Sequence, residues 1–203
     1  MKNQKNLKIL AECAIMIGLA AVLSEIKFFN LPFGGSVTLF SMVPVILIAL
    51  RHGFGWGMAC ASAYSVTQLL FGLGHLAWVP TVPGKIFCVL FDYIAAFGCL
   101  GIAGAFKKPM DSANDRGRKI GIISAAVVLV CALRYISHNI SAAVVWYGLF
   151  AEPGENLSRY IIYTALSYNA AYMVPETIIT LVAAPAITTA LAAIGKKKNP
   201  AGE

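Results

Sequence analysis

The chain has 203 residues, of which 59% are hydrophobic and only 12% are charged, and its mean hydropathy is +0.74. A soluble domain carries roughly 25% charged residues, so this composition excludes a disordered chain, a coiled coil and an ordinary soluble enzyme. It predicts a protein that crosses a membrane several times. The formal charge of +7 does not indicate a nucleic-acid partner, because the basic residues lie between apolar runs, where membrane topology places them.

Six apolar segments are predicted to cross the membrane as helices, since a spanning helix needs about 20 mostly apolar residues. In chain order they are residues 9–26, 37–50, 54–71, 80–106, 119–147 and 167–194. The second segment is short and contains Pro44, so we expect it to be tilted, broken or shielded by its neighbours. No convincing cleavage site follows the first segment, which is therefore predicted to be a retained helix. The expected fold is an all-α bundle of six transmembrane helices, forming a single membrane domain over residues 1–203.

Lysine and arginine gather on one side of this arrangement. With the amino terminus inside, the outer connections hold two basic residues, Lys27 and Arg159. The inner segments hold 12, namely Lys2, Lys5, Lys8, Arg51, Lys107, Lys108, Arg116, Arg118, Lys119 and Lys196 to Lys198. Because basic residues favour the cytoplasmic side, both termini are predicted to be cytoplasmic.

Common catalytic and cofactor motifs are missing from the sequence. It contains no G-x-x-x-x-G-K-[ST], no H-E-x-x-H and no G-x-S-x-G. The five cysteines all lie in apolar stretches without a C-x-x-C pair, which favours buried free thiols over a metal or disulfide framework. We therefore expect neither an enzyme nor a bound cofactor, and we expect any use of ATP to fall to partner proteins.

The fourth to sixth segments carry polar side chains that helices facing lipid do not need. A charge at the bilayer centre costs about 2.5–3.5 kcal/mol on insertion scales, so each such group needs a partner or a function. The set comprises Lys85, Asp92, Tyr93, Arg134, Ser137, His138, Asn139, Trp146, Tyr168, Asn169, Tyr172 and Glu176. At about 1.5 Å per residue, Asp92, His138 and Glu176 are predicted to share one depth in the outer half of the membrane, with Asn169 near the outer rim.

These groups predict a pocket that opens to the outside and binds an aromatic or cationic small molecule, since a carboxylate beside aromatic rings suits such a ligand. Each residue also has a purely structural interpretation. Arg134 can form an ion pair with Asp92 or Glu176, and His138 can serve as a hydrogen bonder in helix packing. Trp146 can belong to an interfacial aromatic belt, and Lys85 can extend to the membrane surface.

Motifs spread over nearly the whole chain resemble those of one family. They are Gly34-Gly35-Ser36-Val37-Thr38, Met42-Val43-Pro44, Arg51-His52-Gly53, residues 92–97, residues 134–141 with Trp146, and residues 168–176. In this order they are similar to the thiamine-specific S-components, the substrate-binding membrane subunits, of energy-coupling factor (ECF) transporters. The Arg-Tyr-x-x-His and Tyr-Asn-x-x-Tyr-Met-x-Pro pieces separate this family from S-components for other vitamins.

The resemblance implies a subunit that binds thiamine from outside and assembles with one coupling protein and two ATPase subunits in the lipid membrane. By the family's pattern, the contacts to thiamine fall on Asp92, Tyr93, His138, Trp146, Tyr163 and Asn169. Asp92 and Tyr93 then meet the aminopyrimidine, and Trp146 stacks on the thiazolium. The spacing from Tyr163 to Asn169 is one residue longer than in the family. The family's aromatic residue in the first outer loop has only Phe28, Phe29 and Phe33 as counterparts here.

In the first segment, Ala14 and Gly18 form a small-x-x-x-small pattern that lets helices approach closely, and the resemblance implies that they contact the coupling protein. Two other functions remain open at this stage. One is an S-component for a thiamine precursor such as hydroxymethyl-pyrimidine. The other is an ion-coupled secondary transporter of a small aromatic cation, with Asp92, Glu176 and Arg134 as a relay.

Overall fold

Four helical runs are long and apolar enough to cross a membrane within residues 2–198, which the computed structural model describes. They are Asn3–Glu25, Val82–Asp111, Arg116–Phe150 and Leu157–Leu191. These runs correspond to the first, fourth, fifth and sixth predicted segments. The helical membrane bundle is thus confirmed, whereas the count of six spanning helices is not. The side chains of Lys2, Phe33 and Lys196 to Lys198, which the sequence analysis also used, lie outside the described part.

Three of these runs change helix type along their length. The second consists of α5 (Val82–Cys88), η2 (Val89–Ala95), α6 (Ala96–Gly98), η3 (Cys99–Phe106) and α7 (Lys107–Asp111). The third consists of α8 (Arg116–Ser141), η4 (Ala142–Trp146) and α9 (Tyr147–Phe150), and the fourth of α10 (Leu157–Tyr163), η5 (Thr164–Asn169) and α11 (Ala170–Lys198). Segments η2, η4 and η5 are π-helical, and η3 is a 3₁₀-helix.

The second predicted segment is a short buried helix rather than a span. It becomes α2 (Val43–His52), in which seven of ten residues are buried. Pro44 lies in the first turn, where its missing N–H costs nothing, and Gly53 with φ +88° ends the helix. Of the three alternatives that the sequence left open, shielding by neighbouring helices is therefore confirmed. The third predicted segment is α3 (Phe54–Phe71), and the short α4 (Leu73–Leu76) follows it.

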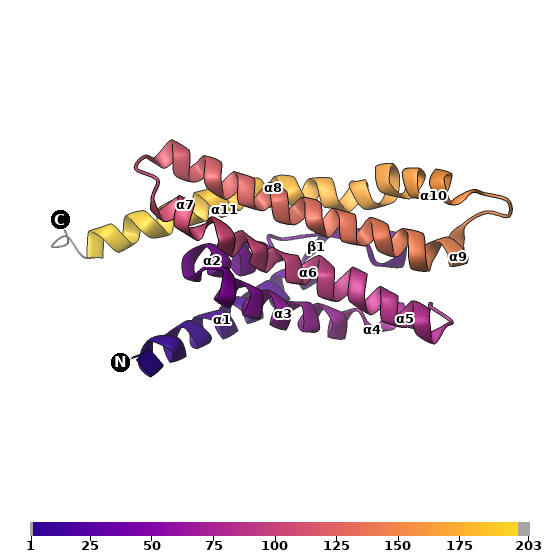
Figure 1. Ribbon diagram of the computed structural model, residues 1–203, viewed down its shortest axis with the longest axis horizontal. Helices are drawn as coiled ribbons and strands as arrows, with labels where there is room; N and C mark the ends of the chain where they lie inside the picture. Colours follow the sequence, from indigo (N-terminus) through magenta and orange to yellow (C-terminus); the bar gives the residue numbers. More distant parts are fainter. Residues whose placement is uncertain (1, 199–203) are drawn as a thin grey trace.

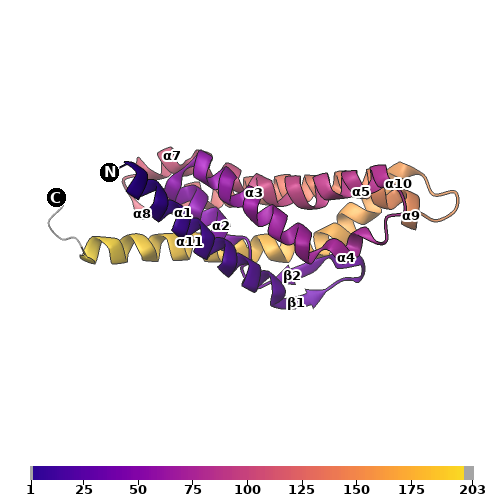
Figure 2. The same cartoon turned by 90° about the horizontal axis from the view of Figure 1, so that it is seen from below.

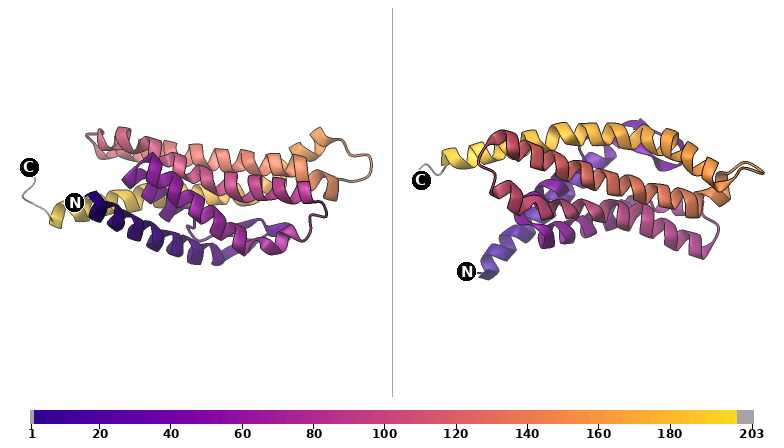
Figure 3. Two further views of the ribbon diagram at one scale, coloured as in Figure 1. Left: turned by 60° about the horizontal axis from the view of Figure 1, so that its bottom comes forward. Right: turned by 45° about the horizontal axis from the view of Figure 1, so that its top comes forward.

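Glycines bring α3 and η3 into close contact. A Cβ atom on Gly101 would lie 2.7 Å from the backbone of Gly57, and one on Gly104 would lie 2.6 Å from that of Gly53. Such distances are too short for any side chain, so the two backbones approach as closely as small residues allow in membrane bundles. On the other side of the bundle, α8 packs along α11, as the right-hand view of Figure 3 shows.

The start of the first helical run and the end of the fourth lie at one end of this elongated bundle (Figure 1). The connection between α7 and α8 is also there, with Lys107, Lys108, Arg116 and Arg118 beside it, and we call this the basic end. Residues 77–81 and 151–156 make the connections at the opposite end, and they contain no lysine or arginine.

A hairpin that the sequence did not predict follows α1 (Lys2–Glu25). Strand β1 (Lys27–Asn30) pairs antiparallel with β2 (Ser36–Thr38), with Asn30 opposite Ser36. The connection is loop 31–35, which contains the 3₁₀ turn η1 (Pro32–Gly34). Figure 2 shows the hairpin beside the bundle, and β2 packs against α11. Non-helical backbone is tolerated in a membrane protein where it lines a cavity, and loop 31–35 does so here.

Candidate ligand-binding site

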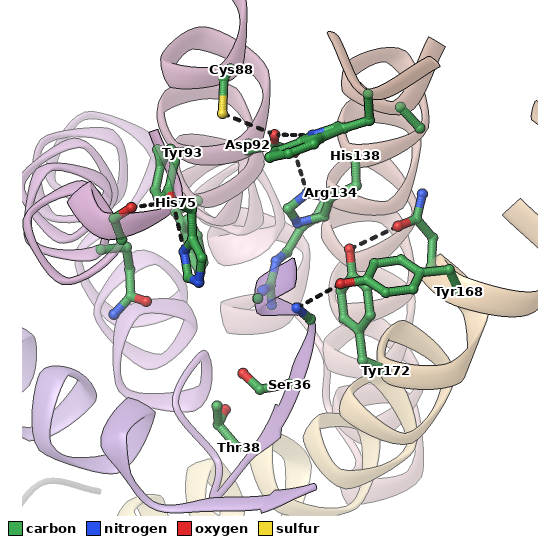
Figure 4. A pocket seen from close by; sticks show the side chains of 18 of the residues that line it. Ser36, Thr38, His75, Cys88, Asp92, Tyr93, Arg134, His138, Tyr168 and Tyr172 are labelled. Carbon is green, nitrogen blue, oxygen red and sulfur yellow. Dashed lines mark hydrogen bonds and ion pairs between the residues drawn. The ribbon is translucent and has the colours of Figure 1, made fainter. Parts of the chain in front are cut away.

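A cavity of about 470 Å³ lies among the helices near the hairpin. This volume falls within the range of about 300–1,000 Å³ that is typical of sites for small ligands. The cavity is lined by residues of η2, α8, η4, η5 and α11 on one side and of α1, the hairpin, α3 and α4 on the other, and they include Asp92, Arg134, His138, Trp146 and Asn169. The cavity therefore collects many of the polar residues predicted on the three late helical runs (Figure 4), but not Lys85, Ser137, Asn139 or Glu176.

The three π-helical segments lie where these runs meet the cavity. Segment η2 contains Asp92 and Tyr93, η4 contains Trp146, and η5 contains Tyr168 and Asn169. A π-helical turn accommodates an extra residue within a helix and occurs frequently at functional sites. Because the extra residue turns the following side chains around the helix axis, these segments determine which groups face the cavity.

Asp92 accepts hydrogen bonds from four side chains. Its Oδ1 accepts from His138 Nδ1 at 3.0 Å. Its Oδ2 accepts from Ser141 Oγ at 2.5 Å and from Trp146 Nε1 at 3.1 Å. Cys88 Sγ is a fourth, weaker donor at 3.4 Å. The carboxylate is thus held by three donors from the neighbouring run Arg116–Phe150 and by Cys88 of its own run.

His138 presents its second ring nitrogen without a partner. Because an ionised carboxylate only accepts hydrogen bonds, the proton of Nδ1 points to Asp92. In the neutral imidazole, Nε2 then carries a lone pair. Nε2 is buried and makes no hydrogen bond to the described residues. Tyr172 packs edge-on to the ring, with centroids 5.7 Å apart. Since unpaired buried polar atoms are rare, His138 Nε2 is suited to accept a hydrogen bond from a ligand.

Trp146 lies within the cavity wall. Its indole N–H donates to Asp92, and its ring stacks on Phe150 with centroids 5.8 Å apart and planes 10° apart. A residue that only served an interfacial belt would need no bond to a partly buried carboxylate. The aromatic pair therefore provides a wall of stacked rings beside the negative charge of Asp92.

Asn169 is buried, with only 3% of its surface exposed. Its Nδ2 donates to Asn139 Oδ1 at 3.0 Å, and its Oδ1 accepts from the Tyr172 hydroxyl at 3.1 Å. The predicted position near the outer rim is therefore wrong, because the helical run begins at Leu157 rather than near Ser167. Tyr160, Tyr163 and Thr164 in this stretch line the cavity, and together with Arg159 and the two serines they make it too polar to be recognised as part of a span.

The two tyrosines of the predicted site differ in their surroundings. Tyr93 is 8% exposed and donates to the Gly72 carbonyl at 3.1 Å, so it ties η2 to the end of α3. Tyr163 contributes to the cavity wall but is 69% exposed. Tyr160 and Thr164, which flank Tyr163 on the same helical run, are buried and also line the cavity.

Loop 31–35 is fixed over the cavity by side chains on two sides. The Tyr168 hydroxyl donates to the Pro32 carbonyl and accepts from the Gly35 N–H at 3.0 Å. On the other side, a Cβ on Gly34 would lie 2.9 Å from the His75 ring, and the φ of +104° at Gly34 suits glycine. The loop therefore closes one side of the cavity between Tyr168 and His75.

The predicted common layer of Asp92, His138 and Glu176 is only partly present. Asp92 and His138 are bonded, but Glu176 does not line the cavity. Glu176 is 1% exposed, and its Oε1 accepts from the Thr38 N–H at 2.5 Å and from Thr38 Oγ1 at 2.6 Å. The ion pair considered for Arg134 is also absent, since no carboxylate of the described residues lies within 4.0 Å of it. Glu176 thus anchors the hairpin.

Comparison with known proteins identifies the family of this fold. A family model described as "Thiamine transporter protein (Thia_YuaJ)" matches residues 10–195. The chain belongs to this thiamine transporter family. It is 36% identical over 189 residues to the thiamine transporter ThiT of Bacillus subtilis (strain 168), a match that covers 88% of this chain and 89% of that protein.

The fold of the family has also been solved experimentally. The structure of ThiT from Listeria monocytogenes superposes with a TM-score of 0.72 over 92% of this chain and 96% of that one, at 24% sequence identity. At this identity the likeness concerns the fold. Membership of the thiamine transporter family, together with the long apolar helices, makes the chain a multi-pass protein of the plasma membrane.

Several residues of the family member's cavity were not singled out from the sequence as site residues. Ser141 and Cys88 donate to Asp92, and Tyr168 fixes loop 31–35. Cys88 lies four residues before Asp92, and Ser141 lies three residues after His138. These spacings place each of them on the helix face that carries a predicted site residue. A small polar residue at such a spacing from a predicted site residue is the signal that would have found them.

Proposed function

We propose that this chain is the high-affinity thiamine-binding S-component of an ECF-type vitamin importer in a bacterial cell membrane. The observation that carries the proposal is the Asp92–His138–Trp146 cluster, in which a fixed carboxylate, an unpaired ring nitrogen and stacked indole line one cavity of a thiamine transporter family member. Tyr93, Tyr163 and Asn169 complete the proposed thiamine contacts.

The chemistry of thiamine matches this cluster. Thiamine has a permanently charged thiazolium ring and a neutral aminopyrimidine with an exocyclic amino group. Because Asp92 already accepts from four side chains, the amino group in our proposal donates to His138 Nε2 rather than directly to Asp92, as the resemblance had implied. The negative charge of Asp92 stabilises the bound cation. The thiazolium packs on the face of Trp146, where a desolvated cation–π contact contributes up to about 2 kcal/mol. The amide of Asn169, held by Asn139 and Tyr172, orients the pyrimidine.

The direction of capture follows from the distribution of basic residues. We place the basic end in the cytoplasm, because loops rich in lysine and arginine favour that side. Both termini are then cytoplasmic, and thiamine enters from the opposite end, between the membrane helices of a single domain over residues 1–203. An uncharged precursor such as hydroxymethyl-pyrimidine lacks the thiazolium, so it leaves Trp146 without a cation to bind.

Energy for import is proposed to come from a coupling protein and two ATPase subunits. Ala14 and Gly18 in α1 are exposed, and no other part of the described protein lies within 4 Å of a Cβ built on Gly18. A partner helix can therefore approach α1 closely there. We expect Ala14→Trp and Gly18→Trp to abolish partner-dependent uptake in cells while thiamine binding to the purified protein stays within about twofold. Loss of binding in a folded variant would contradict this assignment.

Binding itself is tested by titrating the purified protein with thiamine and following tryptophan fluorescence and heat. We expect Asp92→Asn to weaken binding by about 1.5–3 kcal/mol, or roughly ten- to 150-fold, because the amide lacks the charge and turns one acceptor into a donor. Asp111→Asn is the matched control, since Asp111 pairs with Lys107 at the basic end. If hydroxymethyl-pyrimidine competed with thiamine and bound as tightly, the result would favour the precursor as the ligand.

A further inference from the structure

Arg134 is a buried cation in the cavity wall. Its residue surface is 7% exposed, and it lines the same cavity as Asp92 and His138. It lies four residues before His138 in α8, which is about one helical turn towards the basic end. Figure 4 shows its side chain reaching from α8 into the middle of the pocket, below Asp92 and His138.

The contacts of Arg134 leave most of its donors unused. The guanidinium lies over the Phe97 ring, with Cζ 4.4 Å from the centroid. Stacking of this kind supports the charge but leaves the N–H groups at the edge of the guanidinium free. Nη1 donates to the Met42 sulfur at 3.0 Å, a weak acceptor. Nε is buried and has no partner among the described residues.

The carboxylates near the cavity are already occupied. Asp92 accepts from His138, Ser141, Trp146 and Cys88. Glu176 accepts twice from Thr38, and it lies more than 4.0 Å from the guanidinium. A buried charged donor without an acceptor is costly. An acceptor supplied by a bound ligand would remove this cost.

We propose that Arg134 forms a second recognition point of the cavity, which binds an oxygen on the side chain of the ligand. The proposal rests on the function proposed above. In thiamine the acceptor is the oxygen of the hydroxyethyl tail, and in a phosphate ester of thiamine it is a phosphate oxygen. Because the guanidinium repels the thiazolium, the ring lies towards Asp92 and Trp146, and the tail extends from it towards Arg134. Arg134 thus determines the orientation of the ligand.

The test compares ligands with and without the oxygen, by calorimetry on the purified full-length protein. The probes are thiamine, an analogue with ethyl in place of hydroxyethyl, and thiamine monophosphate. We expect the wild-type protein to bind the ethyl analogue about ten- to 150-fold more weakly than thiamine. This comparison needs no variant, so it holds even if substitutions at Arg134 impair folding.

Substitutions then assign the effect to the side chain. In Arg134→Met, thiamine and the ethyl analogue should bind within about threefold of each other, and Arg134→Lys should keep part of the difference. Arg159→Met, which removes an exposed arginine outside the cavity, should keep all of it. If Arg134→Met weakens the binding of thiamine monophosphate more than that of thiamine, the recognition point takes an anionic ester. If it weakens the binding of thiamine more, the recognition point takes the hydroxyl.

Two results would overturn the proposal. Equal binding of thiamine and the ethyl analogue by the wild-type protein would show that no tail oxygen is recognised. If a folded Arg134→Met variant still bound thiamine and the ethyl analogue with the full wild-type difference in affinity, another group would recognise the oxygen. Failure of the wild-type protein to bind thiamine at all would instead overturn the proposed function, and the role of Arg134 with it.

Discussion

Asp92 accepts three hydrogen bonds from the neighbouring helical run, and these fix its carboxylate in the absence of a ligand. Ser141 and Trp146 meet Oδ2, and His138 meets Oδ1. A charge that is fixed in advance by hydrogen bonds needs little rearrangement when a cation arrives, which favours tight binding. The ligand itself is left with the free nitrogen of His138 and the aromatic faces.

Trp146 has two roles that a substitution can separate. Trp146→Phe keeps a ring face but loses both the bond to Asp92 and part of the cation–π attraction, so we expect thiamine binding to weaken by about 0.5–1.5 kcal/mol. A deazathiamine ligand, whose ring is uncharged, should lose less, because only the support of Asp92 changes. Calorimetry with both ligands measures the difference. Identical losses for the two would mean that Trp146 does not stack on the charged ring.

At the scale of elements, the contact between α3 and η3 depends on glycine. The backbones meet at Gly57 and Gly101, where a methyl group has no room. This contact holds η2, and with it Asp92, against α3. The position of the carboxylate is therefore determined partly by residues that never touch a ligand.

Gly101→Ala tests this packing. The added methyl group would lie 2.7 Å from the Gly57 backbone, so we expect a loss of about 1–3 kcal/mol of stability, as for other overpacked contacts. Gly121→Ala is the control, because Gly121 lies in α8 with nothing within 4 Å of an added Cβ. It should be neutral or slightly stabilising, since alanine favours helix. Thermal unfolding followed by circular dichroism compares them, and equal melting temperatures would refute the packing argument.

The long helices could be predicted from the sequence because the length of an apolar run determines whether it spans a membrane. The hairpin could not, since β1 and β2 have only four and three residues and show no usable alternation. The residues of the cavity were recognised by their polarity at membrane depth. The contacts of these polar residues could not be predicted, because they depend on how distant elements pack. Examples are the absence of a carboxylate beside Arg134 and the bond between Glu176 and Thr38.

For the whole molecule, the two ends of the bundle differ in charge. The basic end holds the connection between α7 and α8, and the opposite end holds loops without lysine or arginine. This asymmetry is what directs insertion of a multi-span protein. The cavity and the exposed face of α1 then have fixed positions relative to the two sides of the membrane.

Accessibility of introduced cysteines measures that orientation. Ser112 and Glu152 are exposed and lie at the basic and opposite ends, respectively. In intact cells we expect an impermeant maleimide to label Glu152→Cys fully, and Ser112→Cys only after the membrane is opened. Four of the five native cysteines are buried, so the unsubstituted protein gives the background. Labelling of both positions from outside would refute the orientation.

The π-helical segments also affect how this chain can be aligned with its relatives. Segment η5 holds its extra residue between Tyr163 and Asn169, so counting positions back from the asparagine shifts the comparison by one. One residue corresponds to about 100° around a helix axis, enough to exchange an outward-facing position for an inward-facing one. In this chain Tyr163 is 69% exposed at the cavity wall, whereas Tyr160 and Thr164 are buried there. Evolutionary comparison here should therefore match helix faces, and a one-residue gap in an alignment marks a change in the shape of the cavity.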